Sequence, residues 1–208
     1  MDQDFLSLVP TREGHFRLES GHHGKLWLDL DTLFVEPHKV RPLVDGLAES
    51  LRARAHDLAA VCGPMVGGAF LARMLVSTLQ VEFFFAERML PPEGEGFYRA
   101  EYRLPRGLHE RARGKRVAIV DDVISAGSAA RGTYAELRAH GARPTVVGAL
   151  LVLGTVALKF FAQERVPVIP MVQLPYELWV PDECPLCAAA IPLEDVAVPP
   201  HGQARGES

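Results

Sequence analysis

The sequence is short of cysteine and of long apolar runs, and each shortage excludes a class of protein. Three of the 208 residues are cysteines, Cys62, Cys184 and Cys187, an odd number with no disulfide framework. A reducing cytoplasm is therefore the simplest compartment. The longest apolar run, around residues 146–153, has the length of a strand and is too short to span a membrane.

Net positive charge is also missing. The formal net charge is −4, so the chain as a whole has no basic footprint for nucleic acid. The start, MDQDFLSLVP, lacks the basic and apolar regions of a secretory signal, and we expect none. Hydrophobic residues make up 48% and charged residues 23%, which is typical of a soluble globular protein.

What the chain does contain is a regular alternation of strand and helix patterns from about residue 43 onward. The predicted strands are LAAVC, VEFFFAER, RVAIV, TVVGALLVL and VPVIPMVQL. The predicted helices are PLVDGLAESLRARAHD, GGAFLARMLVSTL, GSAARGTYAELRAHG and TVALKFFAQER. Near-continuous apolar strands that alternate with helices predict an α/β fold, with a mostly parallel sheet and helices on both faces.

Other segments depart from this alternation and suggest a division of the chain. Residues 1–42 form a separate small N-terminal element, and residues 43–180 form the α/β core. Within the core, residues 89–114 are polar and rich in glycine and proline, as expected of a lid loop. Residues 181–208 are a tail whose end we expect to be disordered.

Two adjacent carboxylates, Asp121 and Asp122, follow the apolar strand RVAIV. Ligands of an open parallel sheet bind outside the carboxyl ends of its strands. Burial of two neighbouring carboxylates without partners is costly, and sugar hydroxyls or hydrated Mg²⁺ would satisfy them. The alternative is a plain strand–turn–helix unit in which the aspartates only cap the helix.

The segment SAGS, Ser125 to Ser128, follows directly and leads into a helix. Backbone N–H groups at a helix start can hold a phosphate, and Gly127 permits close approach. The acid pair and this segment together therefore offer acids for a ribose diol beside a cradle for a phosphate.

The whole motif, VAIVDDVISAGSA, resembles the phosphoribosyl pyrophosphate (PRPP) signature of type I phosphoribosyltransferases. Ser125 and Ser128 stand where threonine is more usual. The resemblance implies that fold, a homodimer, and Mg²⁺ bound through PRPP or pyrophosphate. It also implies a ribose role for the acids and a 5-phosphate role for the loop, so the expected PRPP-binding residues are Asp121, Asp122, Val123, Ile124, Ser125, Ala126, Gly127, Ser128 and Ala129.

A second glycine-containing loop lies between a predicted strand and helix, and beside the PRPP signature it resembles the pyrophosphate loop of the same enzymes. It contains no lysine, so main-chain donors would provide the contacts. The expected residues are Gly63, Pro64, Met65, Val66, Gly67 and Gly68. Arg88, at the end of the next strand, is a candidate catalytic clamp on pyrophosphate alongside Asp121 and Asp122, because a guanidinium binds phosphate oxygens in pairs. A solvated strand-end arginine is the alternative.

The lid gives a conflicting indication of the base. The orotate branch of the family usually has a lysine and a histidine here, and that spacing is absent. FYRAEY instead resembles the lid of adenine phosphoribosyltransferases. The lid candidates are Tyr98, Arg99, Glu101 and Arg103. An ordinary solvated hairpin is the alternative.

The segment GHFRLESGHHGKLWLDLD resembles the N-terminal hood of orotate phosphoribosyltransferases. It implies base-binding roles for Ser20, Gly21, Trp27 and Leu28. A core role for Trp27 is equally compatible with the sequence. Glu19 and Gly154 stand where relatives often have lysine and arginine, which weakens the assignment to orotate.

We assign no metal to the remaining histidine and cysteine motifs. CPLC, Cys184 to Cys187, could be half of a zinc site, but four ligands are needed and Cys62 ends a distant strand. We expect no metal held within one chain, although two chains could share an ion. His22 and His23 are expected in an exposed loop.

The sequence thus predicts a cytoplasmic phosphoribosyltransferase, most like the orotate enzymes. It would transfer ribose 5-phosphate from PRPP to N1 of orotate, and its partners would be PRPP and a nucleobase, without nucleic acid or membrane. The alternatives are a purine acceptor of the adenine type and a PRPP-binding regulator without turnover.

Overall fold

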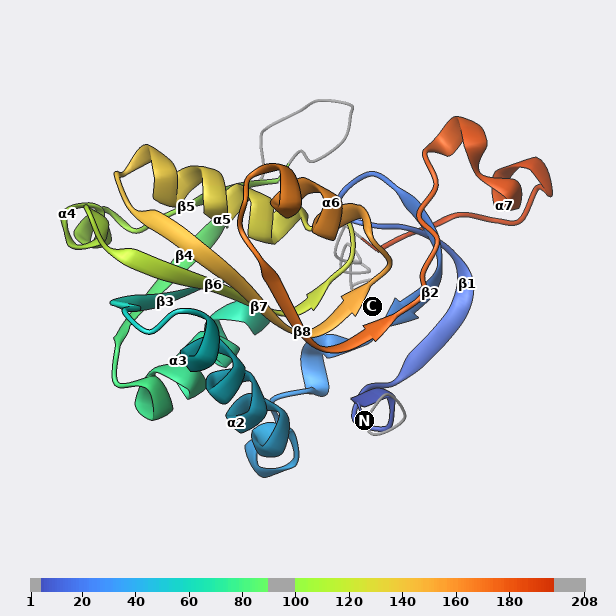
Figure 1. The fold of residues 1–208 in the computed structure, drawn as a ribbon. Helices are drawn as coiled ribbons and strands as arrows, with labels where there is room; N and C mark the ends of the chain where they lie inside the picture. The colour runs from blue at the N-terminus through green and yellow to red at the C-terminus, as the bar shows by residue number, and fades with distance from the viewer. Residues whose placement is uncertain (1–4, 90–99, 197–208) are drawn as a thin grey trace, which may run out of the picture.

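The structure is a computed structural model that describes residues 5–89 and 100–196. The predicted alternation of strands and helices is confirmed (Figure 1). The strands are β1 (Thr11–Arg17), β2 (His23–Leu28), β3 (Ala60–Pro64), β4 (Glu82–Met89), β5 (Glu101–Arg103), β6 (Arg116–Ile124), β7 (Arg143–Leu153), β8 (Val168–Leu174) and β9 (Glu194–Asp195). The helices are α2 (Pro37–Arg54), α3 (Gly67–Leu79), α4 (His109–Ala112), α5 (Ser128–Ala139), α6 (Val156–Gln163) and α7 (Pro185–Ala188), with 3-10 turns η1 (Leu30–Thr32), η2 (Arg106–Leu108) and η3 (Pro181–Glu183).

The main sheet has the order β5-β4-β3-β6-β7-β8, and all its pairings are parallel except β4 with β5. Its strands are apolar on both sides because both faces are covered. In β6, Ala118 and Val120 pack into a core with α2 and α3, whereas Val117 and Ile119 pack into a second core with α5 and α6. Figure 1 shows the two helix pairs on opposite faces of the sheet.

Helix boundaries follow local chemistry. α2 begins at Pro37, which has its fixed φ in the first turn, so the helix crosses the expected boundary between residues 42 and 43. α5 ends before Gly141, whose φ of 76° is the left-handed conformation that glycine adopts at little cost. Among the described residues, no helix is long and apolar enough to cross a membrane.

The hood is a second sheet with the order β2-β1-β9. β1 and β2 pair antiparallel, and β9 adds to β1 in parallel, so the tail folds back onto the hood. The tail prediction was incomplete, since it contains η3, α7 and β9. The expected disorder of its end falls on residues 197–208, outside the described residues.

Only part of the expected lid lies among the described residues. Residues 90–99 lie outside the described residues, but residues 100–114 contain β5, η2 and α4. β5 pairs antiparallel with β4, and Tyr102 and Leu104 are buried, so this half was wrongly predicted as loop. Burial of these two side chains fixes the course of residues 100–114, the return segment of the lid.

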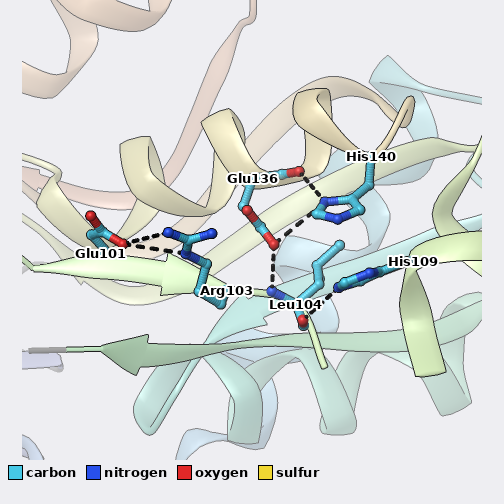
Figure 2. A network of polar contacts seen from close by, with 6 residues as sticks. All are labelled: Glu101, Arg103, Leu104, His109, Glu136 and His140. Atoms are coloured by element: carbon cyan, nitrogen blue, oxygen red, sulfur yellow. Dashed lines mark hydrogen bonds and ion pairs between the residues drawn. The ribbon is translucent and has the colours of Figure 1, made fainter. Parts of the chain in front are cut away.

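A polar network anchors that return segment to α5 (Figure 2). Glu136 Oε1 accepts a hydrogen bond from the backbone N–H of Leu104 at 3.0 Å and lies 3.4 Å from Nδ1 of His140. A ring nitrogen of His109 lies 3.0 Å from the Leu104 carbonyl oxygen. The contacts satisfy a buried carboxylate and fix where the chain leaves the lid.

Candidate active site

The two aspartates lie inside β6 and not after it. β6 continues to Ile124, so the prediction that the strand ends before the acids was wrong. On the β7 side, pairing continues past Asp121, which is paired with Ala149, while the pairing with β3 ends at Ile119. Loss of the β3 neighbour opens one side of the strand, which leaves the acids at the carboxyl edge of the sheet as predicted.

Both carboxylates are buried, each with 7% of the residue surface exposed. The N–H of Asp122 donates to Asp121 Oδ1 at 3.1 Å, and the N–H of Val123 donates to Asp122 Oδ1 at 2.9 Å. Burial, and then repulsion from Asp122, raise the pKa of Asp121 well above its usual range. Burial also raises the pKa of Asp122. The pair is thus short of donors, and hydroxyl groups or a cation would stabilise it.

The loop after β6 leads into the N-terminus of α5. Gly127 has a φ of 82°, and a Cβ there would lie 2.9 Å from the Cβ of Ala157, so glycine suits both the conformation and the space. α5 begins at Ser128, and the first N–H groups of a helix have no partner within it. The expected phosphate cradle therefore has the required backbone geometry.

The second loop packs directly against the acids. A Cβ on Gly67 would lie 1.9 Å from Asp122 Oδ2, and one on Gly68 would lie 2.7 Å from Asp121 Oδ1. Gly67 also begins α3, and the preceding Met65–Val66 peptide bond is cis. Only glycine at these two positions allows the carboxylates to approach this helix start, so the predicted pyrophosphate loop lies against the acid pair.

A cavity of about 220 Å³ opens beside the acids. Its lining combines one acid, one anion loop and the hood: Leu18, Glu19, Leu26, Trp27, Leu28, Leu30, Asp121, Val123, Ser125, Gly127, Ser128, Ala129, Leu153 and Tyr176. The structure therefore brings predicted residues of the N-terminal hood and of the middle of the chain into one pocket. Apart from Glu19, its hood residues are apolar, which suits a flat base.

The hood residues divide into two groups. Trp27 and Leu28 line the cavity. Ser20 and Gly21 are absent from its lining; Ser20 is buried and its hydroxyl lies 3.1 Å from Nδ1 of His22, while Gly21 forms the turn with a φ of 83°. Their base-binding role stays a prediction without direct contact to the cavity.

Tyr176 is a pocket residue that the sequence did not reveal. Its hydroxyl donates to the Leu26 carbonyl at 2.9 Å, which joins the segment after β8 to the hood. A Cβ on Gly154 would lie 2.6 Å from the Tyr176 carbonyl oxygen, and Gly154 has a φ of 69°. Gly154 therefore packs against the backbone of Tyr176, and an arginine at this position would not fit without movement.

Arg88 is held at the edge of the pocket by the hood. Its Nε lies 3.0 Å from Glu19 Oε2, and the hydroxyl of Tyr102 donates to Glu19 Oε1 at 3.0 Å. The arginine balances the charge of Glu19, which removes part of the expected conflict with an anionic base. Burial, and then the charge of Glu19, raise the pKa of Tyr102, so its hydroxyl keeps the proton.

The two lid candidates that the structure describes do not line the cavity. Arg103 and Glu101 form an ion pair with each other at 2.7 Å on the exposed side of β5 and are absent from the cavity lining. Figure 2 shows the pair beside the anchoring network. Tyr98 and Arg99 lie outside the described residues.

No protein-family model matches the chain. Among curated proteins, it is 32% identical to the orotate phosphoribosyltransferase of Carboxydothermus hydrogenoformans over 189 residues, which is 91% of this chain and 92% of that protein. It is 30% identical to the orotate phosphoribosyltransferase of Thermotoga petrophila, over 88% of this chain and 89% of that one.

Solved structures share the fold. Orotate phosphoribosyltransferase from Aeropyrum pernix matches with a TM-score of 0.62 and 23% identity, over 84% of this chain and 94% of that one. Adenine phosphoribosyltransferase from Rhodothermus marinus matches with a TM-score of 0.63 and 21% identity, over 83% and 97%. Fold similarity alone therefore does not separate the two bases. Sequence similarity along nearly the whole length shows that the chain belongs to the orotate phosphoribosyltransferase family.

Proposed function

We propose that this protein transfers ribose 5-phosphate from PRPP to N1 of orotate, giving orotidine 5′-monophosphate and pyrophosphate. One observation supports this most strongly. The buried pair Asp121 and Asp122 contacts one predicted anion loop through Gly67, and Asp121 shares a cavity with the other loop through Gly127 and Ser128. A ribose with a phosphate at one end and a pyrophosphate at the other fits this order of groups.

The acid pair would accept hydrogen bonds from the ribose 2- and 3-hydroxyls. Backbone N–H groups of residues 125–129 would hold the 5-phosphate at the start of α5. Residues 63–68 would hold pyrophosphate through main-chain donors at the start of α3, with Arg88 as the added cation. These residues would contribute mainly by positioning the reactants and stabilising the charge that leaves with pyrophosphate.

The acid pair is also compatible with Mg²⁺. Hard carboxylate and phosphate oxygens are its preferred ligands, and both carboxylates are buried with their pKa raised. When bound with PRPP, Mg²⁺ would supply positive charge for the pyrophosphate group. Asp121 and Asp122 would hold it through the substrate, while the protein would add few direct ligands.

The base would bind against the hood. Trp27 offers an aromatic face, and Leu28 and Tyr176 extend the wall. Orotate is the acceptor of the curated relatives, and we extend it to this chain. Adenine is the second candidate, favoured by FYRAEY at residues 97–102 and by Glu19 in the cavity lining.

An acceptor panel tests the proposal. The full chain is incubated with PRPP, Mg²⁺ and one of orotate, adenine, guanine or uracil, and both pyrophosphate release and nucleotide formation are measured. We expect product with orotate, and Asp121→Asn should lower kcat/KM for PRPP by about 100-fold or more. Product with adenine alone would replace orotate by the second candidate, and unchanged turnover of the variant would overturn the role of the acids.

The same panel separates an enzyme from a PRPP-binding regulator. Thermal protection by PRPP without pyrophosphate release for any base would favour the regulator.

We further propose a cytoplasmic homodimer, on the family resemblance, and light scattering of the purified chain measures the oligomeric state. A monomer that retains full turnover would contradict that part.

A further inference from the structure

Two histidines of the hood and two cysteines of the tail form a compact cluster. His15 lies in β1 and His23 in β2. Cys184 directly precedes α7, and Cys187 lies within it. The ligand atoms of all four side chains lie within 4.8 Å of one another. His15, His23 and Cys184 are each 3% exposed, and Cys187 is exposed. The expectation that His23 lies in an exposed loop was wrong, because β1 and the tail cover it.

The separations match those of a tetrahedral zinc site. Zn–N and Zn–S bonds place neighbouring ligand atoms about 3.3 to 3.8 Å apart in a tetrahedron. His15 Nε2 lies 3.0 Å from His23 Nδ1, 3.4 Å from Cys184 Sγ and 3.7 Å from Cys187 Sγ. Cys187 Sγ lies 3.3 Å from His23 Nδ1. A small adjustment of side chains would place all four atoms around one ion.

A second contact orients one of the imidazoles for this task. Nδ1 of His15 lies 2.8 Å from the carbonyl oxygen of Ile191, which can only accept, so Nδ1 carries the hydrogen. The lone pair is then on Nε2, which faces His23 Nδ1 and both sulfurs. Metal-binding histidines typically have their other nitrogen held in this way.

Backbone pairings hold the tail to the hood both before and after the two cysteines. His23 and Trp179 exchange hydrogen bonds of 2.8 and 3.0 Å, which brings the chain just before Cys184 to β2. β9 pairs with β1 at Phe16 with Glu194, just after the cluster. Cys184 and Cys187 are separated by two residues, the spacing of many zinc-binding turns. These backbone pairings bring the four residues together.

The other histidine cluster of the described residues does not share these properties. Glu136 already accepts from the Leu104 N–H, and His109 faces the Leu104 carbonyl oxygen, so both have protein partners (Figure 2). It is explained by the anchoring of the lid's return segment.

We propose that His15, His23, Cys184 and Cys187 bind one structural zinc ion that ties the tail to the hood. Four protein ligands leave no open position, so the ion would take no part in the transfer reaction. The hood also carries Glu19 and Trp27 of the cavity, so the ion would stabilise the wall of the active site.

Metal analysis of the full chain tests the proposal. The protein is purified, reconstituted with zinc, freed of loose metal and analysed by elemental mass spectrometry. We expect about one zinc ion per chain. We expect loss of zinc in Cys187→Ser, and that exposed position can be changed without disturbing a core. Cys184→Ser and His23→Ala should also lose it, with a lower Tm than the wild type.

Matched controls give the result its meaning. Cys62→Ala removes the remaining thiol and His38→Asn removes an exposed imidazole, and both should keep the zinc. Cobalt added to the apoprotein should give a thiolate-to-cobalt charge-transfer band that Cys187→Ser loses. Equal zinc in all variants, no zinc after reconstitution, or a Cys184–Cys187 disulfide in the reduced preparation would each overturn the proposal. Turnover is measured separately, so failure here leaves the proposed transferase activity standing.

Discussion

Arg88 Nε lies 3.0 Å from Glu19 Oε2, so the strand that leads into the lid is tied to the hood through a charged pair. Arg88 is 30% and Glu19 29% exposed at the side chain, so solvent screens part of their attraction. Such a pair contributes at most about 1 kcal/mol to stability. The larger consequence is that the contact with Glu19 would have to break before Arg88 could bind a substrate anion.

Arg88→Ala and Glu19→Gln should therefore differ. If Arg88 clamps pyrophosphate, Arg88→Ala lowers kcat/KM for PRPP by about 10- to 100-fold, because charged hydrogen bonds are lost. Glu19→Gln keeps the cation and should stay within about fivefold of the wild type. Steady-state kinetics at saturating base measures both. Equal small effects of the two variants would reduce Arg88 to a structural role.

The Asp121 carboxyl gives stability a defined pH dependence. Its pKa in the folded protein is raised above the ordinary 3.8, so the folded state holds its proton to higher pH than the unfolded state. The stability it contributes is present below the unfolded pKa and is lost as pH rises towards the folded pKa. Asp121→Asn removes this loss. Its free energy of unfolding relative to the wild type should increase with pH above about 4, by up to about 1.4 kcal/mol per pH unit.

Urea unfolding of both proteins at several pH values checks this prediction. Subtracting the two curves cancels the groups that lie far from the site, and the difference reports Asp121 together with its neighbour Asp122. A difference that stays flat, or shrinks as pH rises, would contradict a raised pKa for the buried acid.

Gly67→Ala should disable the site through Asp122. The new Cβ would lie 1.9 Å from Asp122 Oδ2, so the carboxylate or the helix start must move. Displacement of about 1 Å in a reacting arrangement costs about 100-fold in rate, and we expect at least this loss in kcat/KM. Gly107→Ala is the matched control, since nothing lies within 4 Å of its added Cβ. Comparable activity of the two variants would contradict the prediction that the close approach of Gly67 to Asp122 is needed for the reaction.

Trp27 should determine the affinity for the base and not for PRPP. It lines the cavity, and the centroid of its ring lies 6.4 Å from that of the Phe16 ring. Trp27→Ala should raise KM for orotate about tenfold while KM for PRPP changes little, and Trp27→Phe should retain most of the affinity. A loss of stability with unchanged KM for orotate would instead identify Trp27 as a core residue.

The core was predictable from the sequence because its signals are local. Apolar strands such as residues 116–120 alternate with helices that begin near glycine, and the acid pair stands beside a glycine loop. The exact end of β6 was not predictable, because it depends on β7, which continues to pair after β3 has ended. An acidic residue inside a strand contradicts local propensity and is explained only by the site.

Contacts between residues far apart in the chain could not be predicted from the sequence. His15 and Cys184 are joined by hood pairing and by β9, a two-residue strand with no periodic signal. Tyr176 reaches the hood carbonyl of Leu26 only after β8 has brought it there. The CPLC motif was visible, but its histidine partners could be found only once the tail was seen to return to β1.

The most direct measurement is a crystal structure of the protein with PRPP and Mg²⁺. The account predicts the ribose 2- and 3-hydroxyls on Asp121 and Asp122, and the 5-phosphate on the backbone N–H groups of residues 125–129. PRPP bound elsewhere, or carboxylates turned away from the sugar in the occupied site, would contradict it.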